Sequence, residues 1–269
     1  MHPFIHILGK EIPMYSICIM AGMLVAGGVI VLLSPRFSVK RDDALYSYLY
    51  AILVMIAGAK LMYIIVNIPN LPKMIEEYGF LALMQGGFVV YGGLLGAFLG
   101  VAIYGWQFKM DPKPLYSVLI VGVPLAQAFG RVGCFMAGCC YGKICFGSYC
   151  VYMQGVSRFP VQLLASGLDL LLFFILLASV FIKRARHYQF SLYMIGYGIV
   201  RFICEFFRGD EERGFIGPLS IAQWFSILFV CVGIILFVIR FKKVEQPVLS
   251  ADGKVSAGNL DIQKEEKNG

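Results

Sequence analysis

Two arginines lie inside apolar stretches that are long enough to cross a lipid bilayer. Arg131 lies in the stretch 116–136, and Arg201 lies in the stretch 190–207. An arginine near the middle of a membrane costs about 2.5–3.5 kcal/mol on insertion scales, so such a residue is retained for a partner or a function. The planar guanidinium group donates paired hydrogen bonds to phosphate. The two arginines therefore predict a membrane site for an anionic lipid headgroup.

Polar residues around Arg201 recur at helical spacing. In YGIVRFICEFFR (197–208), Tyr197, Arg201, Glu205 and Arg208 stand at i, i+4, i+8 and i+11, which places them along one face of a helix. Glu205 is spaced to pair with Arg201 and to hold its guanidinium group in place. The alternative is an interfacial aromatic with an ion pair at the helix end. That alternative explains Arg208 but not the more deeply placed Arg201.

Ionisable side chains inside the apolar stretches leave a surplus of positive charge. They are Lys60, Arg131, Asp169, Arg201 and Glu205. One interpretation is that all five pair with one another and hold helices together. The other is a cavity in which the unbalanced arginine charge binds a phosphate.

Glycines surround Tyr91 in the segment QGGFVVYGGLLGAFLG (85–100). Gly92, Gly96 and Gly100 recur at every fourth position, which predicts close packing against another helix. Glycine also lets a ligand approach the backbone, and this would bring the Tyr91 hydroxyl into a polar site. A tyrosine accepts a proton only where neighbouring positive charge stabilises its phenolate. Tyr91 is therefore a candidate catalytic residue, with an interfacial anchor as the alternative.

Cysteines are concentrated in one part of the chain. Disulfides are one interpretation, because the cluster is predicted to lie on the oxidising side of the membrane. Inert thiols are a second. Metal binding or redox catalysis is a third, although no histidine lies nearby and the spacing is not that of a usual zinc motif. The five clustered cysteines are Cys134, Cys139, Cys140, Cys145 and Cys150.

The composition is that of a membrane protein. Of the 269 residues, 59% are hydrophobic and 14% are charged, whereas a soluble domain has about 25% charged residues. We predict an all-α polytopic membrane protein in which residues 1–243 form one membrane domain. The seven predicted transmembrane helices cover 14–34, 43–66, 88–106, 116–136, 161–182, 190–207 and 220–240.

Basic residues in alternate loops predict the orientation in the membrane. Lysines and arginines gather at 36–41, 109–113, 183–186 and 240–243, so these segments should be cytoplasmic. The N-terminus is then outside and the C-terminus is cytoplasmic. The polar stretch 244–269 is predicted to be a disordered cytoplasmic tail. No basic patch with interleaved aromatic residues indicates binding to nucleic acid.

Several ordered motifs resemble those of prolipoprotein diacylglyceryl transferases, a family of bacterial membrane enzymes. Tyr15 in MYSICIMAGMLVAG (14–27) falls on the family's essential tyrosine, and Tyr91 falls on the first position of H/Y-G-G-L-x-G. GRVGCFMAGCCYG (130–142) is similar to G-R-x-G-N-F-x-N-G-E-x-x-G, with Arg131 and Gly142 in place. YGIVRFICEFFR (197–208) has every fixed residue of Y-G-x-x-R-x-x-x-E-F-x-R. The resemblance covers most of residues 1–243.

The chain departs from these motifs at polar positions. The arginines are retained, whereas asparagine, glutamate, histidine and serine positions carry other residues. An acid that usually follows R-H-P-S-Q-L, the motif that RFPVQL (158–163) resembles, is also replaced. Two alternatives therefore stay open: a divergent member with another acceptor, or a thiol-redox or metal-binding membrane protein that uses the Cys134–Cys150 cluster. The replaced positions are Cys134, Ala137, Cys139, Phe159, Val161 and Ala165.

The resemblance implies transfer of a diacylglyceryl group from phosphatidylglycerol to the thiol of a lipobox cysteine in a prolipoprotein signal peptide. It places this lipoprotein maturation step at the outer side of the bacterial cytoplasmic (cell inner) membrane, among membrane lipids. It requires no metal and no other cofactor. It implies that Tyr91, Arg131 and Arg201 are catalytic. The residues implied to bind substrate are Tyr15, Arg131, Gly142, Tyr197, Arg201, Glu205 and Arg208.

Overall fold

Seven long helices dominate the computed structural model of the chain, which describes residues 4–7, 10–70, 75–76, 79, 87–153, 155–209 and 214–245. Within these residues, all seven are long and apolar enough to cross a membrane. The predicted fold class is therefore confirmed. The helices are α1 (Met14–Leu33), α2 (Arg41–Val66), α5 (Val90–Gln107), α6 (Pro112–Ala137), α7 (Val161–Val180), α8 (Gln189–Phe207) and α9 (Ile221–Glu245).

The helix ends follow local sequence signals. Helix α6 begins at Pro112, earlier than predicted, because Asp111 caps it and accepts a hydrogen bond from the backbone N–H of Lys113 at 3.1 Å. It ends where Gly138 adopts a left-handed backbone with φ of 70°. The predicted tail lies outside the described residues from position 246 onward.

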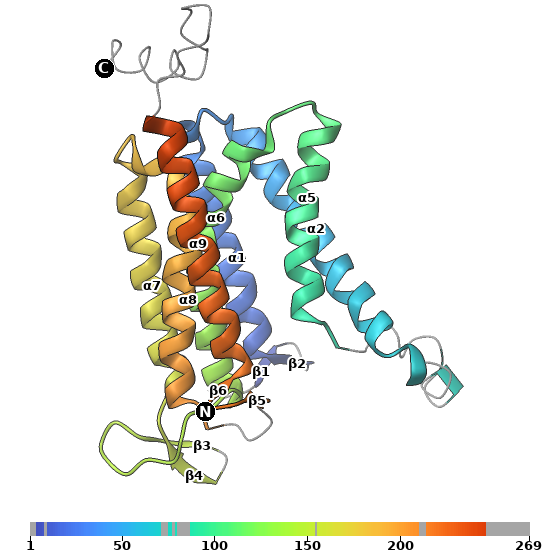
Figure 1. Cartoon of the computed structure of the whole chain (residues 1–269). Coiled ribbons are helices and arrows are strands. Elements are labelled where there is room, and N and C mark those ends of the chain that lie inside the picture. Colours follow the sequence, from blue (N-terminus) through green and yellow to red (C-terminus); the bar gives the residue numbers. More distant parts are fainter. Residues whose placement is uncertain are drawn as a thin grey trace, which may run out of the picture.

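Short elements complete the two ends of the helix bundle. Within the described residues, the strands form three antiparallel hairpins. These hairpins lie at the same end of the bundle (Figure 1). They were absent from the all-helical prediction, because strands of two to four residues leave little periodicity in a sequence. The hairpins are β1 (Phe4–Ile7) with β2 (Lys10–Pro13), β3 (Val151–Met153) with β4 (Val156–Arg158), and β5 (Phe215–Ile216) with β6 (Leu219–Ser220). The same part of the chain also has three turns of 3₁₀ helix: η1 (Ser34–Phe37), η2 (Ile68–Asn70) and η3 (Ala185–Tyr188).

The basic segments lie together at the end opposite the hairpins. The connections α1–α2, α5–α6 and α7–α8 all reach this end, and α9 finishes there (Figure 1). Arg186 ties two of these connections together, because its Nη1 donates a hydrogen bond to the backbone oxygen of Arg36 at 2.9 Å. The predicted grouping of positive charge at one end is present. The assignment of that end to the cytoplasm stays a prediction.

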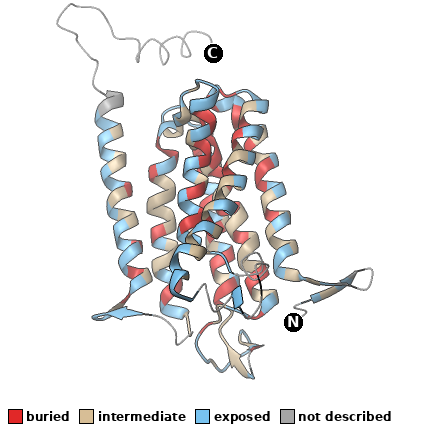
Figure 2. Cartoon of the chain, turned by 90° about the vertical axis from the view of Figure 1, so that its right-hand side faces the viewer, coloured by how far each residue is buried: buried red, intermediate tan, exposed pale blue. Residues whose placement is uncertain are grey.

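Helix α6 occupies the centre of the bundle. Half of the residues in its apolar membrane-spanning stretch are buried, the largest share among the seven helices. Leu115, Val118 and Val121 of this helix have no exposed surface, and they pack in one cluster with Ile30 of α1 and Leu176 of α7. Figure 2 shows the buried residues, in red, gathered on the central helices, with exposed residues on the outward faces. The site arginine of α6 is therefore carried by the most enclosed helix.

Helices α2 and α5 form a closely packed pair beside this bundle (Figure 1). A Cβ atom added at Gly96 would overlap the backbone oxygen of Val54, and it would lie 3.0 Å from the Cα of Met55. Gly92 and Gly58 meet backbone to backbone in the same way, and Gly100 faces Tyr50. The glycine spacing thus predicted the correct contact face.

An alanine at Gly96 is expected to destabilise this pair by about 1–3 kcal/mol, because the neighbouring atoms are backbone and cannot rotate away. The measurement is loss of helical circular dichroism on heating in detergent micelles. Gly28→Ala in α1 is the matched control, since nothing lies within 4 Å of its added Cβ. Alanine favours the helix by about 1 kcal/mol there. Equal stability of the two variants would contradict this account of the α2–α5 contact.

Candidate active site

A pocket opens between helices α6, α7 and α8 near the hairpin end of the bundle. Its empty volume, including the part open to solvent, is about 380 Å³. Polar and apolar residues both line it. The lining residues are Arg131, Cys140, Val161, Gln162, Ala165, Asp169, Tyr197, Val200, Arg201, Cys204 and Arg208.

Three guanidinium groups converge on this pocket. Arg131 comes from the last turns of α6, Arg201 from α8, and Arg208 from the residue that follows α8. Two buried carboxyl groups accompany them, those of Glu205 and Asp169. The surplus of positive charge predicted from sequence is therefore gathered in one cavity, although Lys60 of α2 takes no part in lining it. Such a cavity is suited to an anion.

Glu205 holds two of the arginines. Its Oε2 lies 3.1 Å from Nη2 of Arg201 and 3.9 Å from Nη1 of Arg208. The Glu205 side chain is only 2% exposed, whereas the Arg201 side chain keeps 20% of its surface. The Arg201 guanidinium group is thus held by an ion pair, and it is still accessible from the pocket. The helical spacing predicted this pairing correctly.

Asp169 contributes a carboxyl group to the wall of the pocket, and the site predicted from the sequence did not include it. It lies in α7 and is 2% exposed. Its Oδ1 atom has no hydrogen-bond partner within the described part of the chain. The charges of Arg131 and Arg201 act on it. The signal that could have identified it was its presence among the few ionisable residues of the spans.

Gln162 is the second omitted residue. It is 1% exposed, and its Nε2 donates a hydrogen bond to the backbone oxygen of Cys139 at 2.7 Å. This bond ties the start of α7 to the loop that follows α6. The glutamine is the Q of RFPVQL, so the resemblance of this segment to R-H-P-S-Q-L could have identified Gln162 as a site residue.

Tyr197, a predicted substrate-binding residue, lines the pocket. Its ring stacks on Tyr193 with centroids 5.6 Å apart, and the Tyr193 hydroxyl accepts a hydrogen bond from Nε2 of Gln127 at 3.0 Å. This contact joins α8 to α6. It fixes Tyr197 one helical turn from Arg201 and on the same face.

Tyr15 and Tyr91 lie outside the set of residues that line this pocket. Tyr15 packs on α6, where its Cδ2 would lie 3.1 Å from a Cβ added at Gly133. This places it beside the last turns of α6, which carry Arg131. Tyr91 is 58% exposed, and its ring faces Phe225 of α9 with centroids 6.0 Å apart. The structure therefore brings together five of the predicted site residues around the pocket: Arg131, Tyr197, Arg201, Glu205 and Arg208.

Gly142 acts on the site through the backbone. A Cβ at this position would overlap the backbone oxygen of Phe159 and would lie 2.9 Å from that of Phe207. Gly142 also pairs with Arg208 as an isolated antiparallel bridge. The neighbouring Lys143 N–H donates to the Phe207 oxygen at 2.9 Å. Gly142 therefore fixes the loop after α6 against the end of α8, directly before Arg208.

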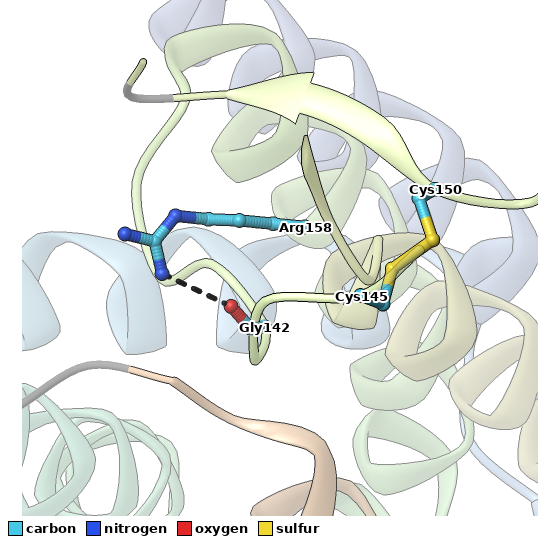
Figure 3. Close-up of a disulfide and its surroundings, with 4 residues drawn as sticks. All are labelled: Gly142, Cys145, Cys150 and Arg158. Carbon is cyan, nitrogen blue, oxygen red and sulfur yellow. Dashed lines mark hydrogen bonds between the residues drawn. A yellow bond between two sulfur atoms is a disulfide. The ribbon is translucent and has the colours of Figure 1, made fainter. Parts of the chain in front are cut away.

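The cysteine cluster divides into two parts. Cys145 and Cys150 form a disulfide, with Cα atoms 6.1 Å apart, beside the β3–β4 hairpin (Figure 3). Arg158 reaches back from β4, and its Nη1 donates to the Gly142 oxygen at 3.4 Å, as the dashed line in Figure 3 shows. The other three cysteines, Cys134, Cys139 and Cys140, are thiols, and their sulfur atoms all lie within 4.8 Å of one another.

Cys140 links the thiol cluster to the pocket. The pKa of its thiol is lowered to about 5, first because of a hydrogen bond with the Cys134 thiol and further because the charges of Arg208 and Arg131 lie nearby. Its backbone φ is 54°, in the left-handed region that is unusual for a residue other than glycine. This turn directs the chain back over the end of α6.

Known proteins are similar to this chain over most of its length. The prolipoprotein diacylglyceryl transferase family matches residues 3–239. A phosphatidylglycerol–prolipoprotein diacylglyceryl transferase of Clostridium tetani is 36% identical over 252 residues, which cover 88% of this chain and 97% of that protein. A second such transferase, from Clostridium perfringens, is 32% identical over 86% of this chain and 92% of that protein.

A third relative comes from Lactococcus lactis subsp. lactis. It bears the same transferase name and is 32% identical over 85% of this chain and 90% of its own length. The family match thus covers six of the seven membrane helices in full, most of α9, the arginine pocket and the loop that follows α6. This chain belongs to the prolipoprotein diacylglyceryl transferase family.

Proposed function

We propose that this membrane protein transfers the diacylglyceryl group of phosphatidylglycerol to the thiol of a lipobox cysteine in a prolipoprotein. The observation that carries the proposal is the pocket in which Arg131, Arg201 and Arg208 converge between membrane-spanning helices. The family relationship supports it, because relatives over most of the chain bear the name of this transferase. A pocket that gathers arginines between helices able to span a membrane is suited to a substrate that is both anionic and a lipid.

Arg131 and Arg201 would bind the phosphate of phosphatidylglycerol. Glu205 holds Arg201 at 3.1 Å and is not among the residues that line the pocket, whereas Arg201 is, so the guanidinium group can also donate to phosphate oxygens. The same contacts would stabilise the charge that develops when glycerol phosphate leaves. Tyr197, which lines the pocket, would hold the headgroup there. Tyr15 packs on the last turns of α6 and would support the same part of the site.

The reaction replaces one bond at a glycerol carbon. The cysteine sulfur attacks the carbon that bears the phosphate, a C–S bond forms, and the C–O bond to the phosphate breaks. The product is a thioether, and glycerol phosphate departs as an anion held by the arginines. The thiol must lose its proton as it attacks. Two residues are candidate acceptors: Tyr91, which the family motif indicates, and Asp169, which lies in the pocket wall.

Two departures from the family motifs lie in the pocket itself. Val161 and Ala165 line it where the resemblance implies a serine and an acid. This part of the wall is therefore less polar than the motifs imply, whereas the arginine side is intact. We assign phosphate binding to the arginine side and expect any difference in acceptor preference to arise at Val161 and Ala165.

The proposed location is the bacterial cytoplasmic membrane, with the pocket toward the outer side. The residues that line the pocket belong to the ends of α6, α7 and α8 nearest the β3–β4 hairpin. The described hairpins share one end of the bundle, and the basic connections lie at the other (Figure 1). By the positive-inside rule, the basic end faces the cytoplasm. A prolipoprotein would then meet the pocket after its signal peptide enters the membrane.

The test is transfer by the purified protein. It is incubated in detergent with radiolabelled phosphatidylglycerol and a lipobox peptide, and the peptide is analysed by mass spectrometry. We expect the cysteine peptide to gain one diacylglyceryl group and a peptide with serine in place of cysteine to gain none. Absence of product with a folded protein would contradict the proposal. In the same assay, Tyr91→Phe and Asp169→Asn separate the two candidate proton acceptors.

A further inference from the structure

Three cysteine sulfurs gather where the loop after α6 folds back over the helix end. Cys134 belongs to the last turn of α6, and Cys139 and Cys140 follow the helix. Their Sγ atoms lie within 4.8 Å of one another. The transfer reaction proposed above uses none of them. We propose that these three thiols form a binding site for one thiophilic cation, of the zinc(II) or copper(I) class. This inference does not depend on the transferase function.

The distances suit such an ion. A zinc ion bound to thiolates at about 2.3 Å in tetrahedral geometry separates its sulfur ligands by about 3.8 Å. The cluster reaches this separation by contracting about 1 Å at most, which side-chain rotation supplies. Thiolate ligands select zinc and copper(I) over magnesium or calcium, which prefer oxygen. A disulfide would join only two of the three sulfurs and leave the third without a partner.

The backbone around the cluster is already fixed. The N–H of Cys139 donates to the backbone oxygen of Cys134 at 3.1 Å, which closes the turn after α6. Gln162, itself buried, holds the Cys139 oxygen at 2.7 Å. One residue beyond Cys140, the Tyr141 oxygen accepts from the N–H of Gly209 at 3.0 Å. Contacts that orient ligating residues in this way strengthen metal binding.

Charge and access are also favourable. Three thiolates around a dication carry a net negative charge, and Arg131 and Arg208 line the same pocket as Cys140. Burial differs between the three residues, since Cys134 is buried, Cys140 is half-buried and Cys139 is exposed. The exposed Cys139 leaves a side through which an ion can enter, and a fourth ligand such as water can complete the coordination.

The direct test measures metal bound to the whole protein. The reduced protein in detergent is dialysed against Zn²⁺ or Cu⁺, and bound metal is counted by mass spectrometry. We expect one ion per chain. The affinity should fall at least about 100-fold in Cys134→Ser, Cys139→Ser and Cys140→Ser, because each removes one of three ligands. The matched control is Cys231→Ser, an exposed cysteine of α9, which should bind as the unaltered chain does.

A second test needs no variant and so does not depend on correct folding of the serine proteins. A membrane-permeant maleimide labels thiols of the unaltered chain, and each cysteine is quantified by peptide mass spectrometry. Saturating metal should slow labelling of Cys139 while leaving Cys231 unchanged, although both are exposed. Failure of both ions to bind, or equal labelling with and without metal, would overturn the proposal. So would a disulfide among Cys134, Cys139 and Cys140 in protein trapped directly from the membrane.

Discussion

Replacement of Arg201 by alanine is expected to lower the rate of diacylglyceryl transfer about 10²–10³-fold, the loss typical when one donor to a developing anion is removed. The same loss is expected for Arg131→Ala. Both guanidinium groups line the pocket, and both would contact the phosphate as its charge increases. Because such contacts are stronger in the transition state than in the bound substrate, kcat should fall more than KM rises.

These variants should still fold, since neither leaves a buried carboxylate alone. In Arg201→Ala, Glu205 keeps Arg208 at 3.9 Å. In Arg131→Ala, Arg201 still acts on Asp169. Arg201→Lys is informative as well, because lysine keeps the charge but lacks the planar fork. We expect its activity to lie between those of the unaltered chain and the alanine variant.

The measurement is the radiolabelled lipid assay on protein of verified thermal stability. Arg36→Ala serves as the control, because Arg36 is exposed at the opposite end of the bundle. It should transfer lipid at the rate of the unaltered protein. An unchanged rate in either Arg131→Ala or Arg201→Ala would rule out the role assigned to that residue.

Replacement of Gly142 by alanine is also expected to abolish most transfer, in this case because the loop after α6 is displaced. The added methyl group would overlap the Phe159 oxygen and press on the Phe207 oxygen at 2.9 Å. Both are backbone atoms, so the loop must move, and overpacking of this kind costs about 1–3 kcal/mol. The bridge between Gly142 and Arg208 would open, and the loop that carries Cys140 would shift relative to Arg208.

Two measurements separate this effect from direct loss of a binding group. Thermal unfolding should begin at a lower temperature in Gly142→Ala, whereas it should be nearly unchanged in Arg201→Ala. The control is Gly167→Ala in α7, where nothing lies within 4 Å of the added Cβ. It should retain both stability and transfer. Full activity in Gly142→Ala would show that the packing of this loop does not position the site.

The sequence predicted the membrane helices because their length and apolarity are local properties. Each of the seven predicted stretches overlaps one helix of the structure, and the ends differ by a few residues. Arg201, Glu205 and Tyr197 were also predictable together, since one helix carries them at multiples of its turn. The contact face of α5 followed from Gly92, Gly96 and Gly100 in the same way.

The pairing of the cysteines could not be predicted from the sequence. Five cysteines allow several pairings, and spacing alone does not choose among them. The structure pairs Cys145 with Cys150 because the β3–β4 hairpin and the bridge between Ile144 and Arg158 bring those segments together. The same folding leaves three other thiols at the end of α6. A metal site there was an open alternative in the sequence and becomes a specific proposal only with the distances.

The amino-acid sequence by itself predicted seven helices long and apolar enough to span a membrane, the resemblance to the diacylglyceryl transferases, and an anion site at the two arginines. Only the tertiary structure decided that Asp169 and Gln162 of α7 complete the pocket wall, and that Tyr91 packs toward α9 instead. The physical reason is that helix periodicity defines which face a residue occupies, whereas the neighbour of that face depends on how separate helices pack.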